Sequence, residues 1–203
     1  MFRIKIKDII SYAQKHNLPI FRTINGLDFN LNIWGFRSDS KDTKTYNDSC
    51  AVFWENHRRQ WNIEYFEITT DPSNLLLENP INGTGTAILK EGHHKAIWSL
   101  GYHKDRKDHR ALVQTRPCTV YRDNDKNGLI GTNLPTETGM FGINMHRASG
   151  VHNNRLIGLY SAGCQVHYDV DMYNRVFIPL VQAAYNEGFT QFSYTLCLEN
   201  WFK

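Results

Sequence analysis

A histidine and a cysteine that together suit covalent catalysis lie in the stretch 139–166. His146 ends an apolar run, and Cys164 follows 18 residues later, directly after Ser-Ala-Gly. The thiolate is the reactive form of cysteine, and an ordinary pKa of about 8.5 leaves little of it at neutral pH. A nearby imidazole can take the thiol proton, and Gly163 lets the backbone approach a substrate carbonyl. The pair therefore predicts acyl transfer through a thioester, with N–H groups around Gly163 and Cys164 holding the oxyanion.

Each of these residues also has a purely structural interpretation. A free cysteine is usually inert packing, and one histidine on a strand is more often a hydrogen-bonded structural residue than a base. The catalytic interpretation rests on the joint presence of four residues in one stretch: His146, Ser161, Gly163 and Cys164. Three groups are candidates for orienting the imidazole, namely a backbone carbonyl, Asn144 and Asn153.

A histidine followed at this distance by Ser-x-Gly-Cys resembles the catalytic signature of the L,D-transpeptidases, the YkuD-type cysteine enzymes of bacterial cell walls. The resemblance implies that His146 is the catalytic histidine and Cys164 the nucleophile. It also matches Ser161 to the serine before the nucleophile and Gly163 to the invariant glycine. It covers residues 139–166 and no more of the chain.

Two positions depart from the family pattern. Ala162 stands where the family often has histidine, which should leave the chemistry intact and alter the pocket. Val166 stands where the family often has arginine or asparagine, which leaves open how a substrate carboxylate is held. Arg147 and Arg155 are the candidates for that role. His103, in an aromatic and histidine-rich run, is a further candidate for the substrate cleft.

The resemblance implies a substrate and two outcomes. The substrate would be the stem peptide of peptidoglycan, attacked between an L-centre and a D-residue. Water would then resolve the acyl-enzyme in an L,D-carboxypeptidase-like hydrolase, and an amine would do so in a transpeptidase. The altered residues around Cys164 and the missing secretion signal favour hydrolysis slightly.

Residues 1–10 contain no uninterrupted apolar stretch of a secretory signal, and no apolar run approaches the length of a membrane span. We therefore expect a protein made in the cytoplasm that acts on the cell wall after release or injection. A phage lysis or virion component, or a secreted effector, would fit that description.

Two other classes of function are alternatives. A non-catalytic module on the same fold would bind wall or virion components, with Cys164 as a buried structural residue. A cysteine peptidase acting on proteins ranks lower, because the papain-type signature C-G-x-C-W is absent. Iodoacetamide separates the first alternative from an enzyme: a catalytic thiol labels much faster than the other three cysteines, and more slowly once His146 is alanine.

Composition indicates one globular domain. The 203 residues are 41% apolar and 13% aromatic, which is ample for a core, and residues 1–20 form an N-terminal helical element. A net charge of +3 does not argue for nucleic acid. The four cysteines are far apart without a CxxC, so we expect reduced thiols.

No cofactor or metal is predicted. The histidines at 93, 94, 103 and 109 complete no recognised ligand spacing. The turn 123–128 begins like a calcium loop, but the glutamate needed at the twelfth position is absent: Leu134 occupies it, followed by Pro135. A hydrated turn is the better interpretation.

Hydrophobic periodicity predicts the elements that must position these residues. Helices are expected over 5–16 and 169–187, the second kinked at Pro179. Strands are expected over 27–35, 50–54, 63–69, 86–89, 118–122, 141–146 and 191–197. A short extended run at 156–160 is expected beside 141–146, so that imidazole and thiol face each other. The fold class is mainly β or α+β, compatible with the mixed sheet of an L,D-transpeptidase domain with an N-terminal helix and one late helix.

Overall fold

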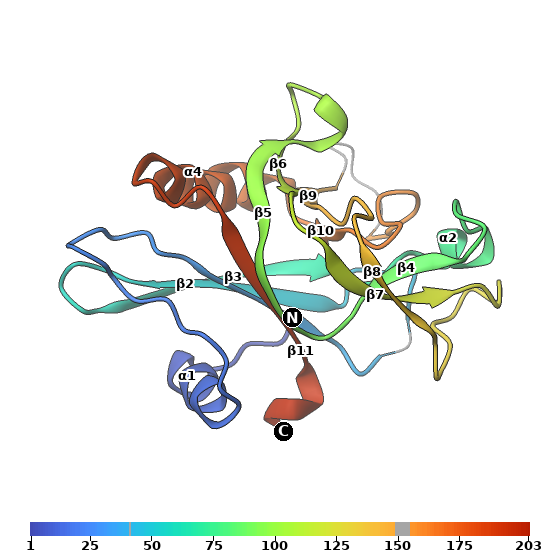
Figure 1. The fold of residues 1–203 in the computed structure, drawn as a ribbon, viewed down its shortest axis with the longest axis horizontal. Helices are drawn as coiled ribbons and strands as arrows, with labels where there is room; N and C mark the ends of the chain where they lie inside the picture. Colours follow the sequence, from blue (N-terminus) through green and yellow to red (C-terminus); the bar gives the residue numbers. More distant parts are fainter. Residues whose placement is uncertain (41, 149–154) are drawn as a thin grey trace.

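The computed structural model describes residues 1–40, 42–148 and 155–203 (Figure 1). Within these residues, eight strands close into a barrel, and a smaller sheet of three strands stands beside it. In spatial order the barrel strands are β1 (Asn32–Arg37), β11 (Phe192–Leu198), β5 (Gly92–Tyr102), β6 (Arg110–Gln114), β9 (Met145–Arg147), β10 (Gln165–His167), β3 (Trp61–Thr69) and β2 (Asp48–Glu55). The small sheet has the order β4 (Thr86–Leu89), β7 (Cys118–Asp123), β8 (Thr136–Gly139). The predicted mainly β fold class is confirmed.

Helices cover the barrel at two places, as Figure 1 shows. The N-terminal helix α1 (Ile6–Lys15) confirms the prediction for 5–16. The late helix is split into α3 (Val170–Met172), a π turn (Tyr173–Phe177) and α4 (Ile178–Asn186). Pro179 explains the irregularity, because it lacks the N–H that a continuous helix would need. The sequence did not predict α2 (Asn74–Glu78), a single turn capped by the Ser73 hydroxyl.

Both faces of strand β1 are buried, although the alternation predicts a half-buried strand. Ile33 faces the barrel interior, where the main core lies. Trp34 and Phe36 face outward and pack with Ile9 and Ala13 of α1 in a second core. The amphipathic helix therefore covers what would otherwise be a solvent-facing side of the sheet.

Strand β1 begins at residue 32 rather than 27, so the first part of that prediction is wrong. Asn25 and Gly26 form a turn with positive φ. The N–H groups of Asp28 and Phe29 then donate to the Glu187 carboxylate at 3.3 and 2.8 Å instead of to a neighbouring strand. A carboxylate distant in sequence thus replaces the strand pairing.

The remaining predicted strands are confirmed apart from one. The hairpin β2–β3 is antiparallel in register from Asp48↔Ile68 to Glu55↔Trp61, and β4, β7 and β11 lie where expected. The strand predicted over 141–146 shrinks to β9. The side chain of Gln114 accepts the N–H groups of Phe141 (3.1 Å) and Ile143 (2.9 Å), which occupies the backbone that a strand would pair.

Residues 156–160 form a turn rather than the expected extended run. The N–H of Tyr160 donates to the carbonyl of Ile157 at 3.1 Å, and Gly158 has a φ of 55°. The neighbour of β9 is instead β10, which the sequence did not predict. No helix in the described ranges has the length and apolar character needed to span a bilayer.

Candidate functional site

Two short parallel strands bring the proposed base and nucleophile to neighbouring positions. Strand β10 pairs with β9 in the register Gln165↔Met145 and Val166↔His146. Cys164 directly precedes β10, and the N–H of Gln165 donates to the carbonyl of Asn144 at 2.9 Å. Because side chains alternate along a strand, Cys164 and His146 lie on the same face, two residues apart along the ladder. The pairing expected from the sequence is achieved by a different strand.

The imidazole of His146 has the tautomer of a general base. Its Nδ1 lies 2.8 Å from the carbonyl oxygen of Arg147. A carbonyl only accepts, so Nδ1 carries the proton and Nε2 has a free lone pair. That Nε2 atom is buried, with no hydrogen-bond partner in the described part of the chain. Of the three candidates for orienting the ring, the backbone carbonyl is the one found; Asn153 lies outside the described residues.

Two further histidines surround this ring. The His103 ring stacks on His146 with centroids 3.9 Å apart and planes at 28°, and His109 meets it edge-on at 5.4 Å. Asn144 fixes His103, because its amide nitrogen lies 3.2 Å from His103 Nδ1 while its oxygen accepts the N–H of Gln114 at 2.8 Å. Among the described residues, no three His, Cys, Asp or Glu side chains are arranged to hold a metal ion.

Burial keeps these imidazoles neutral. Desolvation, with His103 adding repulsion, lowers the pKa of His146 well below its usual value near 6.5. Desolvation and then His109 lower the pKa of His103 to about 4. Each ring therefore resists protonation, and His146 remains an unprotonated base at neutral and mildly acidic pH.

The Cys164 thiol is partly buried and also neutral at rest. Its Sγ donates to the carbonyl of Gly142 at 3.4 Å. Burial raises its pKa, while the Asn144 N–H and the Lys104 ammonium act in the opposite direction. Within the described ranges, no hydrogen bond joins this thiol to His146. The arrangement suits proton transfer during attack rather than a pre-formed thiolate–imidazolium pair.

Ser161 and Gly163 shape the backbone around the thiol. The Ser161 hydroxyl oxygen lies 2.8 Å from the carbonyl oxygens of both Asp71 and Cys164, which share its single proton, and it accepts the Gly163 N–H at 3.2 Å. The signature serine is therefore a loop-closing residue. Because the Gly163 N–H is engaged, the oxyanion role expected of it passes to the Cys164 N–H, for which the described residues supply no acceptor.

Gly163 also packs closely against the backbone of β4. It has a φ of 120°, and an added Cβ would lie 2.2 Å from the carbonyl oxygen of Ala87 on β4. We expect Gly163→Ala to lower the free energy of unfolding by more than about 2 kcal/mol, since it combines a clash with backbone strain. Chemical denaturation would measure this loss.

The matched control is Gly92→Ala. Gly92 has a similar φ of 130°, but nothing lies within 4 Å of the added Cβ. It therefore bears the conformational strain without the clash. An equal loss of stability in the two variants would contradict the close packing of Gly163 on Ala87.

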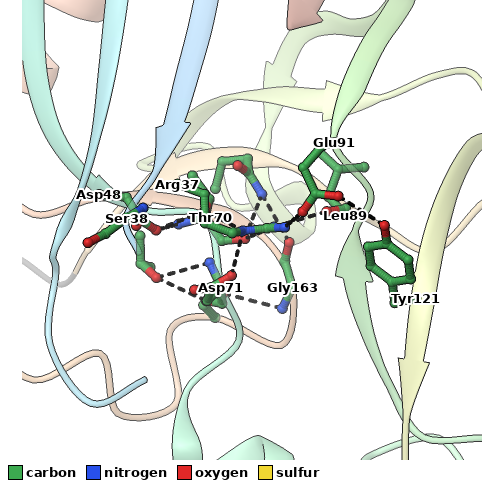
Figure 2. Close-up of polar contacts among 12 residues, drawn as sticks. Arg37, Ser38, Asp48, Thr70, Asp71, Leu89, Glu91, Tyr121 and Gly163 are labelled. Atoms are coloured by element: carbon green, nitrogen blue, oxygen red, sulfur yellow. Dashed lines mark hydrogen bonds and ion pairs between the residues drawn. The ribbon is translucent and has the colours of Figure 1, made fainter. Parts of the chain in front are cut away.

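A buried ionic cluster centred on Arg37 lies beneath this loop (Figure 2). Arg37 Nε lies 2.8 Å from an Asp71 carboxylate oxygen, and its Nη1 pairs with Glu91. Its Nη2 donates to the carbonyls of Thr70 at 3.1 Å and Leu89 at 2.9 Å. One guanidinium thereby joins the end of β1 to the end of β3 and to the segment that links β4 with β5.

Gln165 ties the nucleophile segment to that cluster. Its amide nitrogen donates to the carbonyls of Thr70 at 3.4 Å and Gly163 at 3.3 Å, and its oxygen accepts from the Tyr194 hydroxyl at 2.9 Å. The bond of Ser161 to the Asp71 carbonyl and the bonds of Gln165 therefore anchor the segment 161–165 on both sides of Cys164. The sequence did not predict this cluster or the role of Gln165. The one feature that pointed to the cluster was Arg37, a charged residue at the end of an apolar strand.

Three carboxylates share the single guanidinium of Arg37: Asp48, Asp71 and Glu91. Desolvation raises the pKa of Asp71 to about 7, opposed by Arg37 and reinforced by Asp48 and Glu91. Between its ordinary pKa near 4 and about 7, the folded state therefore holds a proton that the unfolded state releases. The contribution of Asp71 to the free energy of unfolding is then fully present below pH 4 and is lost as pH rises through 7.

We expect Asp71→Asn to remove this pH dependence. Denaturation curves of the wild type and the variant between pH 4 and pH 8 would measure it. As pH rises, the unfolding free energy of the wild type should fall relative to that of the variant. Parallel curves would show that Asp71 is ionised throughout.

A cavity of about 430 Å³ opens beside His146. Its lining includes His103, Lys104, Arg106 and Arg147. Arg106 pairs with Asp108 at 2.8 Å, whereas Lys104 and Arg147 have no carboxylate partner in the described part of the chain. The cavity therefore offers positive charge next to the base.

The three residues proposed from the sequence for substrate binding are not all brought together. His103 and Arg147 line the cavity beside His146. Arg155 pairs with Glu67, and its guanidinium lies 4.8 Å from the centre of the Tyr168 ring. It is absent from the cavity lining, so the structure does not support its expected role.

No family model, curated protein or solved structure matches the chain. The resemblance to L,D-transpeptidases therefore rests on the sequence pattern of residues 139–166.

Proposed function

We propose that the protein is a cysteine-dependent acyl-transfer enzyme that acts on the stem peptides of peptidoglycan. The observation that carries the proposal is the state of His146. Its Nδ1 donates to a backbone carbonyl, and its Nε2 has no partner among the described residues. His146 lies on β9, which pairs in parallel with β10, the strand directly after Cys164. Buried nitrogens of His109 and His167 also lack partners among the described residues, so it is the position of the His146 Nε2, on the strand beside the Cys164 segment, that supports a catalytic role. The resemblance to L,D-transpeptidases supplies the substrate class and the L,D specificity.

The reaction runs through a thioester. Sγ of Cys164 attacks the carbonyl carbon as Nε2 of His146 takes the thiol proton. The N–H of Cys164 donates to the carbonyl oxygen as it becomes an oxyanion. When the C–N bond breaks, His146 returns the proton to the leaving amine. Water then attacks the thioester with His146 as base again, which releases the acid and restores the thiol.

The positive charge in the cavity beside His146 would favour binding of an anionic group of the substrate. Lys104 and Arg147 have no carboxylate partner among the described residues and are the candidates for binding a stem-peptide carboxylate. The cavity is open to solvent, which agrees with hydrolysis over transpeptidation. An amine in place of water would make the same acyl-enzyme a transpeptidase.

The barrel with its parallel β9–β10 pair is then a divergent form of the L,D-transpeptidase sheet domain. In this proposal the enzyme reaches the cell wall after release or injection, as a phage component or a secreted effector would.

A non-catalytic wall-binding module is the second candidate. One observation favours it: burial raises the pKa of the Cys164 thiol, which donates to Gly142 rather than to His146. Such a module would bind peptidoglycan equally well after Cys164→Ala and would leave the stem peptides unchanged.

Mass spectrometry of muropeptides tests the proposal. Purified peptidoglycan is incubated with the protein and with Cys164→Ala. Loss of a terminal D-residue or of a crosslink, seen only with the intact thiol, is the expected result. Exchange of an added D-amino acid would assign a transpeptidase. Identical profiles from both proteins, across several wall chemistries, would contradict an enzyme and favour the binding module.

A further inference from the structure

A second cavity, of about 300 Å³, borders the segment that carries Cys164. It shares no lining residue with the cavity beside His146. Most of its lining is apolar: Leu76, Ile81, Ala87, Met140, Phe141 and Ala162. We refer to it as the apolar cavity.

Three contacts place the apolar cavity next to the nucleophile. Ala162 precedes Cys164 by two residues, and Phe141 precedes Gly142, whose carbonyl accepts the thiol hydrogen bond. The carbonyl of Ala87 is the backbone against which Gly163 packs. The cavity is therefore lined by neighbours of Cys164 and of the carbonyl that accepts its thiol hydrogen bond.

The rim of the apolar cavity exposes large hydrophobic side chains. Ile81 is 81% exposed and Met140 is 55% exposed. A single exposed apolar residue is ordinary, but two at the mouth of one cavity are typical of a surface that a ligand covers.

Arg122 gives this cavity no free charge. Its Nε pairs with Glu137 at 2.6 Å, its Nη1 donates to the Gly85 carbonyl at 3.1 Å, and its guanidinium lies 4.6 Å from the centre of the Phe141 ring. The charge is thus neutralised in place. In the other cavity, by contrast, Lys104 and Arg147 have no carboxylate partner among the described residues.

We propose that the apolar cavity is a subsite for an uncharged, apolar group of the ligand that Cys164 attacks, larger than a methyl group. The inference rests on the proposed function in one respect, that Cys164 is the nucleophile. An anionic group in one cavity and an apolar group in the other would fix the direction in which a substrate lies across the thiol. Ala162 would determine the size of the group accepted, because any larger side chain there fills the space.

Two maleimides that differ in one substituent test the subsite. The rates at which N-phenylmaleimide and N-methylmaleimide label Cys164 are measured by peptide mapping, and their ratio is divided by the ratio for glutathione. We expect a normalised ratio of about five or more, because the phenyl ring is buried in the cavity. Ile81→Ser, Met140→Ser and Ala162→Phe should each lower it toward one.

Leu129→Ser is the matched control, since Leu129 is a 51% exposed apolar residue outside the cavity lining. It should leave the ratio unchanged, and none of the exposed substitutions threatens the fold. A wild-type ratio equal to that of glutathione, or an equal fall in Leu129→Ser, would overturn the subsite.

Labelling needs no turnover, so the two proposals fail separately. A high ratio in a protein that changes no muropeptide would defeat the proposed function and keep the subsite. Muropeptide turnover with a normalised ratio of one would defeat the subsite and keep the proposed function.

Discussion

Cys164→Ala is expected to abolish stem-peptide turnover, lowering kcat by at least roughly 10⁴-fold. Among the described residues, the neighbouring hydroxyl of Ser161 cannot take over, because it is buried and both its proton and its oxygen are engaged in hydrogen bonds. Cys164→Ser should retain little more, since an alcohol is far less acidic than a thiol. Release of product from purified muropeptides, followed by chromatography, measures both variants.

Cys118→Ala is the control for loss of a thiol. Cys118 is buried on β7, and burial raises its pKa to about 11, so it is not a nucleophile at neutral pH. Its replacement should lower stability slightly and leave kcat within about twofold. Activity of Cys164→Ala above the background of the assay would show that another residue carries the chemistry.

His146→Ala is expected to lower kcat by roughly 10²- to 10⁴-fold with a small change in KM. The Nε2 atoms of His146 and His109 both lack a partner in the described ranges of this site, and His146 is the one on the strand that pairs with β10, directly after the thiol. Steady-state kinetics on the same muropeptides would measure the effect. His94→Ala serves as control: His94 on β5 also has a lowered pKa, but it lies outside the cavity beside His146 and bonds the Lys90 carbonyl.

The pH profile gives the same prediction a second readout. The reaction needs a neutral His146, so activity should fall only as pH falls through the pKa of that residue in the folded protein. Burial and His103 hold that pKa well below 6.5. We therefore expect kcat/KM at pH 5.5 to remain close to its value at pH 7. An acid limb centred at 6.5 or above would contradict a buried, neutral base.

Local sequence signals predicted the parts of the fold that depend on neighbours in the chain. Two strand-like runs joined by the polar connection 56–60 predicted β2 and β3. Apolar residues on one face, with Asp169 or Asp171 near the start, predicted the late helix. The strand over 141–146 failed because Gln114, far away in the sequence, occupies its N–H groups. Such a side-chain contact has no periodicity from which to predict it.

The site was predictable where chemistry shows in residue type. The spacing of His146 and Cys164 predicted that the two lie on neighbouring segments, and they do, although β10 rather than 156–160 provides the second strand. Arg147 and Arg155 are alike in sequence, and only the fold sends one to the cavity and the other to Glu67.

The Arg37 cluster was beyond sequence reasoning for a different reason. Asp71 and Glu91 look like surface residues in polar turns, and their burial follows from the docking of the small sheet on the barrel. Gln165 likewise looks like an ordinary polar residue after the nucleophile. Its role comes from the carbonyl of Thr70 and the hydroxyl of Tyr194, both distant along the chain.

The central claim is that Cys164 carries an acyl group during turnover. The direct measurement is intact-protein mass spectrometry after mixing with stem peptides and quenching in acid, which preserves thioesters. We predict a mass increase equal to the donor peptide without its leaving group, mapped to the peptide that contains Cys164 and absent in Cys164→Ala. An adduct on any other residue, or stem-peptide turnover that persists in Cys164→Ala, would contradict the account.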